Sequence, residues 1–204
     1  MPRRRTTTPR STGGPVILRT ETDPRWLPLA LERFDEVLVD HAHCEKKAAA
    51  QALSLLQAYP ALPGLAIQMA QMAREESGHL TRVLRVMEER ELSLTRDLGD
   101  PYVQRLQECI RTAPPLRRID RLLVSAIVEA RSCERLALLA DGVSDPRLRQ
   151  LYAELAQSEH GHQALFFRLA ITASDPQSAT ERLAVLLDLE AEILARIDIR
   201  PAIH

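Results

Sequence analysis

Apolar residues recur every three or four positions through most of the chain, with breaks at clusters of proline, glycine and aspartate. This period predicts amphipathic helices rather than strands. Four long helices are expected at 25–59, 63–92, 115–141 and 146–173, and two shorter ones at 101–112 and 178–197. Short links make the first two and the last two long helices antiparallel pairs. The pattern therefore predicts an all-α fold, a four-helix bundle with one long crossover and accessory helices.

Each of the four long apolar stripes is interrupted by a glutamate, and in two stripes a histidine follows three residues later. The interruptions, in helix order, are Glu45, then Glu76 with His79, then Glu129, then Glu159 with His162. Glu76 follows Glu45 by 31 positions, and Glu159 follows Glu129 by 30. A helical pair with glutamate on one helix and Glu-x-x-His on the other thus occurs twice.

These six side chains predict a centre for two metal ions. A carboxylate in a bundle core is costly unless it is paired or binds a cation, and four converging carboxylates repel one another. Residues three apart share a helical face, so each glutamate–histidine pair can serve one ion. Mixed oxygen and nitrogen ligands suit iron or manganese better than calcium or structural zinc. Such a set is typical of ferritin-like di-iron and di-manganese bundles.

Other residues near these positions need separate interpretations. Glu134 follows Cys133 as Glu45 follows Cys44, but choosing Glu134 would shorten the second spacing to 25 and leave the apolar stripe, so Glu129 is preferred. His41 lies one turn before Glu45, and is either a partner of that ligand or an ordinary core histidine. Cys44 and Cys133 are expected to be small core fillers.

Composition adds expectations about the compartment. The net charge is −1, and the three cysteines stand at irregular spacing, which argues against a disulfide framework and fits a reducing cytoplasm. A signal-peptide core and an apolar run of about 20 residues are both missing, so we expect a cytoplasmic protein with no membrane partner.

The start of the chain differs from the rest in composition. Residues 1–24 are rich in Arg, Thr, Pro and Gly, and hold Arg3, Arg4, Arg5 and Arg10. We expect a flexible basic N-terminal arm over 1–24, followed by a helical-bundle domain over 25–204 that ends with a C-terminal helix.

Four segments carry a resemblance to a known family: "DHAHCEKKAA", "MAREESGHL", "VEARSCERL" and "SEHGHQALF". They resemble the ligand helices of the tRNA-(2-methylthio-N6-isopentenyladenosine) hydroxylases, over approximately residues 25–200. The resemblance implies a ferritin-like di-iron fold, with the six residues above as ligands of two iron ions. It also implies that O2 and an external electron donor, a reductase or electron-transfer protein, are used to hydroxylate the isopentenyl group of the modified adenosine beside the anticodon.

Arginines could serve a tRNA partner, because arginine binds phosphate in a bidentate manner and stacks on bases. The candidates lie in the crossover and on the helix that follows it: Arg111, Arg117, Arg118, Arg121, Arg131 and Arg135. A solvated helix start is the alternative interpretation of this segment. Aromatic residues make up only 3% of the chain, so recognition would rest on phosphate contacts and shape.

The ligands by themselves leave other functions open. A ferroxidase or iron-binding protein, a peroxide-reducing protein and a metal-free structural bundle would share the same helices. We expect a monomer or a small homo-oligomer rather than a storage shell.

Overall fold

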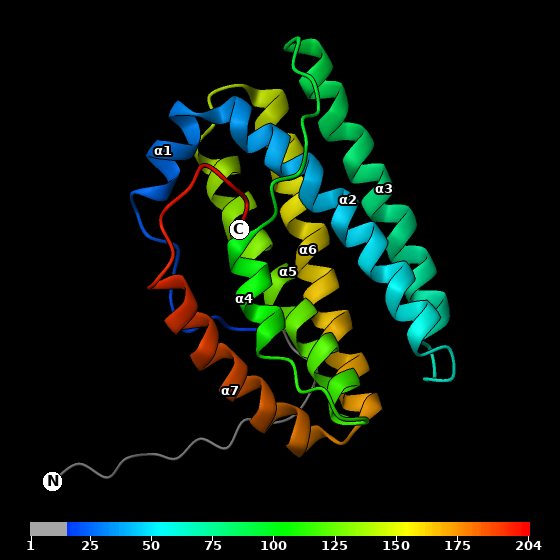
Figure 1. Cartoon of the computed structure of the whole chain (residues 1–204). Coiled ribbons are helices and arrows are strands. Elements are labelled where there is room, and N and C mark those ends of the chain that lie inside the picture. The colour runs from blue at the N-terminus through cyan, green and yellow to red at the C-terminus, as the bar shows by residue number, and fades with distance from the viewer. Residues whose placement is uncertain (1–15) are drawn as a thin grey trace, which may run out of the picture.

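The structure is a computed structural model, and it describes residues 16–204. Over this range the chain forms seven helices and no strand (Figure 1). They are α1 (Trp26–Glu32), α2 (Phe34–Ala58), α3 (Leu65–Glu89), α4 (Pro101–Glu108), α5 (Leu116–Gly142), α6 (Pro146–Ala173) and α7 (Pro176–Leu194).

The four long helices pack as two antiparallel hairpins, α2 with α3 and α5 with α6 (Figure 1). The chain between the hairpins is the long crossover, and it contains α4; α7 packs beside α4, α5 and α6. The predicted all-α, ferritin-like four-helix bundle with one crossover is therefore confirmed. No helix within residues 16–204 is both long and apolar enough to span a bilayer.

Three helices begin at an Asp-Pro pair. At the start of α4, α6 and α7 an aspartate side chain accepts backbone N–H groups of the first turn, and proline follows as the first helical residue. Proline fits there because the first N–H groups of a helix have no partner within the helix. These helix starts, at Asp100, Asp145 and Asp175, set where the helix of the crossover begins, where the second hairpin turns and where α7 begins.

The first predicted helix, 25–59, is wrong in one respect, because the chain breaks at Arg33 (φ −111°, ψ 42°) into α1 and α2. Trp26 is fully buried, and its indole N–H donates to the carbonyl of Ala202 at 3.0 Å. The Arg135 guanidinium lies 5.0 Å from the centre of the indole. Docking of Trp26 against the C-terminal segment thus holds α1 off the axis of α2, without proline or glycine at the break.

The segment before α1 packs on the bundle, so the expected arm does not extend to residue 24. Val16 is buried and donates its N–H to Gln163 Oε1 at 2.9 Å. Thr22 donates its N–H and hydroxyl to the Glu134 carboxylate at 2.8 and 2.7 Å. Glu134, which the spacing rejected as a ligand, therefore anchors this segment. The four arginines of residues 1–10 lie outside the described residues, and a flexible basic arm there stays a prediction.

Apolar clusters lie on both sides of one polar layer in the bundle. Along α3, Met69 and Met72 precede Glu76, and Val83 and Met87 follow it. The other long helices repeat this order, with buried glutamate between apolar turns. The apolar turns thus shield the polar layer from water above and below along the bundle, which strengthens charge interactions within it.

Candidate metal centre

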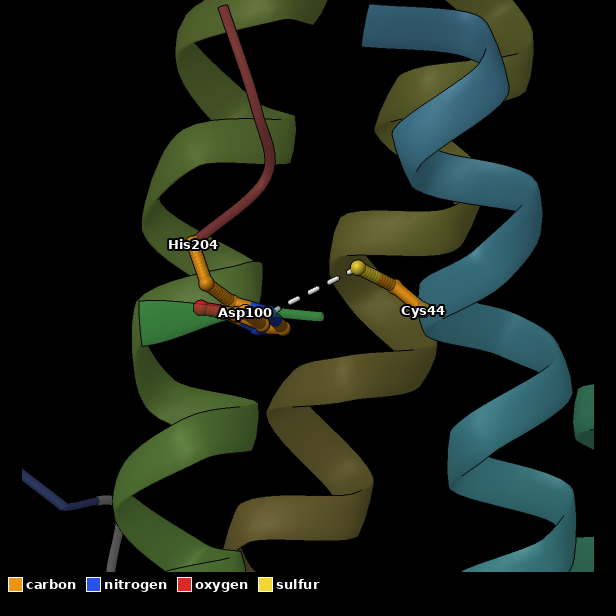
Figure 2. Close-up of side chains that lie close together, drawn as sticks. All are labelled: Cys44, Asp100 and His204. Carbon is orange, nitrogen blue, oxygen red and sulfur yellow. Dashed lines mark hydrogen bonds and ion pairs between the residues drawn. The ribbon is translucent and has the colours of Figure 1, made fainter. Parts of the chain in front are cut away.

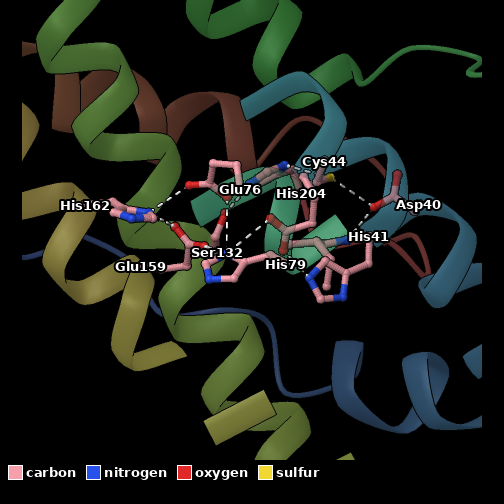
Figure 3. Close-up of polar contacts among 11 residues, drawn as sticks. Asp40, His41, Cys44, Glu76, His79, Ser132, Glu159, His162 and His204 are labelled. Carbon is pink, nitrogen blue, oxygen red and sulfur yellow. Dashed lines mark hydrogen bonds and ion pairs between the residues drawn. The ribbon is translucent and has the colours of Figure 1, made fainter. Parts of the chain in front are cut away.

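The bundle brings the six predicted ligands to one place. Their donor atoms form two groups, and within each group the atoms lie within 4.8 Å of one another. The first group is Glu45, Glu76, His79 and Glu159; the second is Glu76, Glu129, Glu159 and His162. Glu76 and Glu159 belong to both groups, and Figure 3 shows them between His79 and His162. The bundle thus offers two adjacent places where a metal ion could bind, and the carboxylates of Glu76 and Glu159 border both.

Each histidine faces carboxylates from both hairpins. His79 Nδ1 lies 3.3 Å from Glu76, 3.6 Å from Glu45 and 3.8 Å from Glu159. His162 Nδ1 lies 2.8 Å from Glu76 Oε1 and 3.1 Å from Glu159 Oε2. In both pairs the same ring nitrogen, Nδ1, points into the centre, as a donor to a metal would.

Charge in this layer is strongly perturbed. Burial lowers the pKa of His79, but the Glu45 and Glu76 carboxylates outweigh it and raise that pKa to about 10. Burial likewise opposes the carboxylates around His162, which raise its pKa to about 12. Burial and the neighbouring carboxylates of Glu159 and Glu76 raise the pKa of Glu129 well above its usual value. Without metal, the layer therefore compensates its carboxylates with protons.

The residues present fit two divalent cations. Two such ions carry the charge that neutralises four carboxylates, and they would replace the protons on the two imidazoles. Glu76 Oε1 is buried and accepts no hydrogen bond, since its close approach to His162 lacks hydrogen-bond geometry. Such an orphaned buried oxygen is costly unless a cation contacts it. Four carboxylates with two imidazoles suit iron or manganese.

Two further side chains contact the predicted ligands. His41 Nε2 lies 2.7 Å from Glu45 Oε1, and its ring stacks on Tyr152 with centroids 5.7 Å apart. Of the two interpretations of His41, the structure thus places it against the Glu45 carboxylate. Glu75, which the sequence reasoning missed, lies 3.0 Å from Nε2 of His162. Metal-binding histidines commonly hold a carboxylate with their second nitrogen, but only the packing of α3 against α6 could reveal this pair.

A cavity of about 940 Å³ leads to the centre. Four of the six predicted ligands line it, namely Glu45, Glu76, Glu129 and Glu159. Apolar side chains form part of its wall, among them Val103, Ile110, Val124, Val128 and Leu136. Three of the predicted tRNA-binding residues, Arg111, Arg117 and Arg121, line the same cavity. A single space therefore joins carboxylates, an apolar wall and guanidinium groups.

The four predicted tRNA-binding arginines between residues 111 and 121 differ in how far their charges are paired within the protein. Arg117 is exposed, whereas Arg111 forms a two-pronged pair with Asp120 at 2.6 and 2.9 Å. Arg121 donates to Ser54 Oγ at 3.0 Å and lies over the ring of Tyr59. The fourth, Arg118, donates to the carbonyl of Ala173. Arg117 thus has the least committed charge of the four.

The prediction that Arg131 and Arg135 bind tRNA is wrong, because both are buried. Arg131 is 0% exposed and pairs with the equally buried Glu190 of α7 at 2.7 Å. Arg135 is 6% exposed and donates to the carbonyl of Ala202. Helix α7 and the terminal segments cover this face of α5, so these guanidinium groups hold the fold together and cannot reach a phosphate.

Comparison with known proteins places the chain in a family. A family model described as tRNA-(MS[2]IO[6]A)-hydroxylase (MiaE) matches residues 14–204. The chain belongs to the MiaE family. The resemblance drawn from the four ligand segments is confirmed, and it covers both hairpins of the bundle.

Relatives of this MiaE-family chain include two curated hydroxylases. A tRNA 2-(methylsulfanyl)-N(6)-isopentenyladenosine(37) hydroxylase of Pseudomonas putida is 33% identical over 183 residues, which is 90% of this chain and 89% of that protein. A hydroxylase of the same name from Salmonella typhimurium is 32% identical over 133 residues, 64% of this chain and 48% of that protein. The solved structure of protein 43 with aldehyde deformylating oxygenase activity, from Synechococcus, superposes with a TM-score of 0.87 at 37% identity. That match covers 92% of this chain and 94% of the other.

Proposed function

We propose that this protein is an O2-dependent non-haem di-iron monooxygenase that hydroxylates the isopentenyl group of 2-methylthio-N6-isopentenyladenosine beside the anticodon of tRNA. The observation that carries the proposal is the shared cavity, which joins the two ligand groups to exposed and partly exposed arginines. Membership of the MiaE family supports the same substrate.

The ligands proposed for the two irons are Glu45, Glu76, His79, Glu129, Glu159 and His162. Two bound irons would pass two electrons from the external donor to O2, and the C–H bond would supply two more, so that one oxygen atom enters the substrate and the other leaves as water. The overall balance is substrate, O2, two electrons and two protons giving hydroxylated substrate and water. An external electron-transfer protein or reductase supplies the electrons. Glu76 and Glu159 belong to both ligand groups and would serve both ions, and His41 and Glu75 would orient Glu45 and His162, which they contact.

Substrate fit follows from the wall of the cavity. The isopentenyl group is apolar and branched, and side chains such as Val124, Val128 and Leu136 offer it a surface away from water. Arg111, Arg117 and Arg121 stand where phosphates of the anticodon loop would pass as the base enters. The adenosine must leave the loop stack, because the buried carboxylates cannot be reached otherwise.

The direct test is turnover with purified components. Iron-loaded protein, a chemical or enzymatic reductant, O2 and tRNA bearing the prenylated adenosine should give the hydroxylated nucleoside in digests analysed by mass spectrometry. Glu159→Ala is the matched inactive control, because it removes a shared ligand. Absence of hydroxylated nucleoside with fully iron-loaded protein would overturn the proposal, as would an unchanged nucleoside profile in cells lacking the gene.

A second candidate follows from the 37% identity to the Synechococcus protein with aldehyde deformylating oxygenase activity. The apolar part of the cavity wall could hold an aliphatic aldehyde, but such a substrate carries no negative charge that would pair with the arginines of the wall. Long-chain aldehyde with the same reductant and O2 gives the decisive comparison. Conversion of aldehyde to hydrocarbon and formate, without reaction on tRNA, would favour this candidate.

Iron content separates catalysis from storage. A monomer or small oligomer that holds about two irons per chain, matching the two ligand groups, fits the enzyme. A large shell that holds many irons would favour the ferroxidase alternative. Because tRNA is the proposed substrate, we place the enzyme in the cytoplasm.

A further inference from the structure

A second cluster of metal-binding side chains lies beside the di-iron centre and shares no residue with it. Cys44 of α2, Asp100 at the start of α4 and His204 beyond α7 converge, with donor atoms all within 4.8 Å of one another (Figure 2). The three come from segments far apart in the sequence. Cys44 Sγ lies 3.6 Å from His204 Nδ1, and the same nitrogen lies 3.1 Å from Asp100 Oδ2.

These separations match the edges of a tetrahedral ion. Zinc lies about 2.3 Å from sulfur, about 2.0–2.1 Å from imidazole nitrogen and about 2.0–2.2 Å from carboxylate oxygen. Tetrahedral angles then separate sulfur from nitrogen by about 3.6 Å and nitrogen from oxygen by about 3.4 Å. The observed 3.6 and 3.1 Å differ from these edges by roughly 0.3 Å or less. These two of the three edges therefore already fit a tetrahedral ion.

The surroundings also suit a metal ligand set. The other ring nitrogen of His204 lies 2.7 Å from Ser132 Oγ, which fixes the ring and leaves Nδ1 toward Cys44 and Asp100. Asp100 uses Oδ1 to accept the backbone N–H groups of Tyr102 and Val103, so that Oδ2 remains for another partner. Cys44 packs against the apolar core, as expected from the sequence, but its thiol also lies 3.6 Å from Asp40 Oδ2 and 3.6 Å from His204 Nδ1.

An entry path exists. Cys44, Asp100 and His204 all line the 940 Å³ cavity that leads to the di-iron centre. A hydrated ion can therefore reach them, and the fourth coordination position can be filled by water, as in zinc sites with three protein ligands.

We propose that Cys44, Asp100 and His204 form a mononuclear site for a divalent ion of the zinc class, separate from the di-iron centre. Thiolate and imidazole favour zinc or cobalt at this site, whereas the carboxylate-rich centre favours iron. The bound ion would join α2, the start of α4 and the C-terminal segment, and so fix one wall of the substrate cavity. The proposal is independent of which substrate the di-iron centre oxidises.

Cobalt(II) is the sharpest probe, because a thiolate bound to cobalt absorbs in the near ultraviolet and the di-iron centre contains no sulfur ligand. The iron-loaded protein is titrated with CoCl2 alone, and the sulfur-to-cobalt charge-transfer absorption and the bound cobalt are measured. We expect one tight equivalent that gives this absorption in wild-type protein. Cys44→Ser should abolish this absorption. Cys133→Ser is the control and should retain it, because the Cys133 thiol donates a hydrogen bond to the Ala156 carbonyl and is not part of the proposed site.

Two conservative variants separate binding from folding. Asp100→Asn retains the oxygen that caps α4 but loses the charge, and Ser132→Ala removes only the partner of His204. Ser132→Ala should weaken cobalt binding by about 10-fold or more, as loss of such supporting hydrogen bonds does elsewhere, and Asp100→Asn should weaken it further. Circular dichroism should show unchanged helix content in both.

The outcomes are clear-cut. Absence of the absorption in folded wild-type protein would overturn the proposal, and so would an absorption that survives Cys44→Ser. Loss of tRNA hydroxylation with the cobalt signal intact would count against the proposed function alone, since the cobalt measurement does not depend on turnover.

Discussion

Arg117 offers a quantitative test of tRNA binding at the cavity. Its side chain is exposed, lines the cavity and forms no ion pair within residues 16–204, whereas Arg111 is held by Asp120. A phosphate can therefore take the full charge of Arg117 without breaking a bond inside the protein. We predict that Arg117→Ala weakens tRNA binding and raises KM, while kcat with saturating tRNA stays close to the wild-type value.

The magnitude follows from counterion release. Each phosphate neutralised by an arginine contributes about −0.7 to −0.9 to the slope of log K against log salt concentration. Losing one contact should make the slope shallower by this amount. If the variant and the wild type bind equally at about 1 M salt, this change of slope makes the variant bind roughly 5- to 8-fold more weakly at about 0.1 M salt. That loss corresponds to about 1 kcal/mol.

Fluorescence anisotropy with a labelled anticodon stem-loop, measured from about 50 to 200 mM salt, gives this slope. Arg147→Ala is the matched control, because it removes the same charge at the far end of α6. Ala173 of α6 accepts a hydrogen bond from Arg118, the neighbour of Arg117 in the sequence. Arg147 lies 26 residues before Ala173, a distance of about 39 Å along the helix. An unchanged slope for Arg117→Ala, or equal changes in the two variants, would refute the assigned phosphate contact.

Three more predictions address metal loading and the fold. His79→Ala removes a ligand of one group and should leave about one iron per chain, whereas Glu159→Ala removes a shared ligand and should leave almost none; elemental analysis beside circular dichroism checks both. Arg131→Met leaves Glu190 buried without its cation, so the free energy of unfolding in urea should fall by about 3–5 kcal/mol, and adding Glu190→Leu should restore most of it. Burial alone would raise the pKa of Asp120, but its two arginine partners outweigh burial and hold it below the usual 3.8. The stabilisation is therefore present above about pH 4 and is lost as the pH falls, and Asp120→Asn should flatten the pH dependence of thermal unfolding there.

Helical period, together with the repeated spacing, was enough to predict which six side chains the bundle brings together. Glu45 and Glu129 have no local motif, but each interrupts an apolar stripe at the level of a Glu-x-x-His pair on the neighbouring helix. Because antiparallel neighbours with short links keep their register, nearly equal spacings of 31 and 30 predicted that all four glutamates lie in one layer. Local pattern and tertiary structure agree here, since the ligands lie on the core-facing stripe itself.

What the sequence could not predict depends on contacts between distant segments. Nothing near Arg131 distinguishes a phosphate-binding arginine from one that α7 covers, because the partner Glu190 lies 59 residues away. No proline or glycine stands at position 33, and the bend there depends on where Trp26 docks. Ile203 and His204 of the C-terminal segment line the cavity through such contacts with distant residues. Helical periodicity could not predict their position, because they lie outside the helices.

The unequal division of the two ligand groups has a consequence for how the centre is assembled. The first group takes three residues from the α2–α3 hairpin and one carboxylate from the other hairpin, and the second group reverses these shares. Neither group is therefore complete within one hairpin. A hairpin with Glu and Glu-x-x-His would complete both groups only by pairing with a second hairpin of the same design. Any change that moves the two hairpins apart should disturb both groups together.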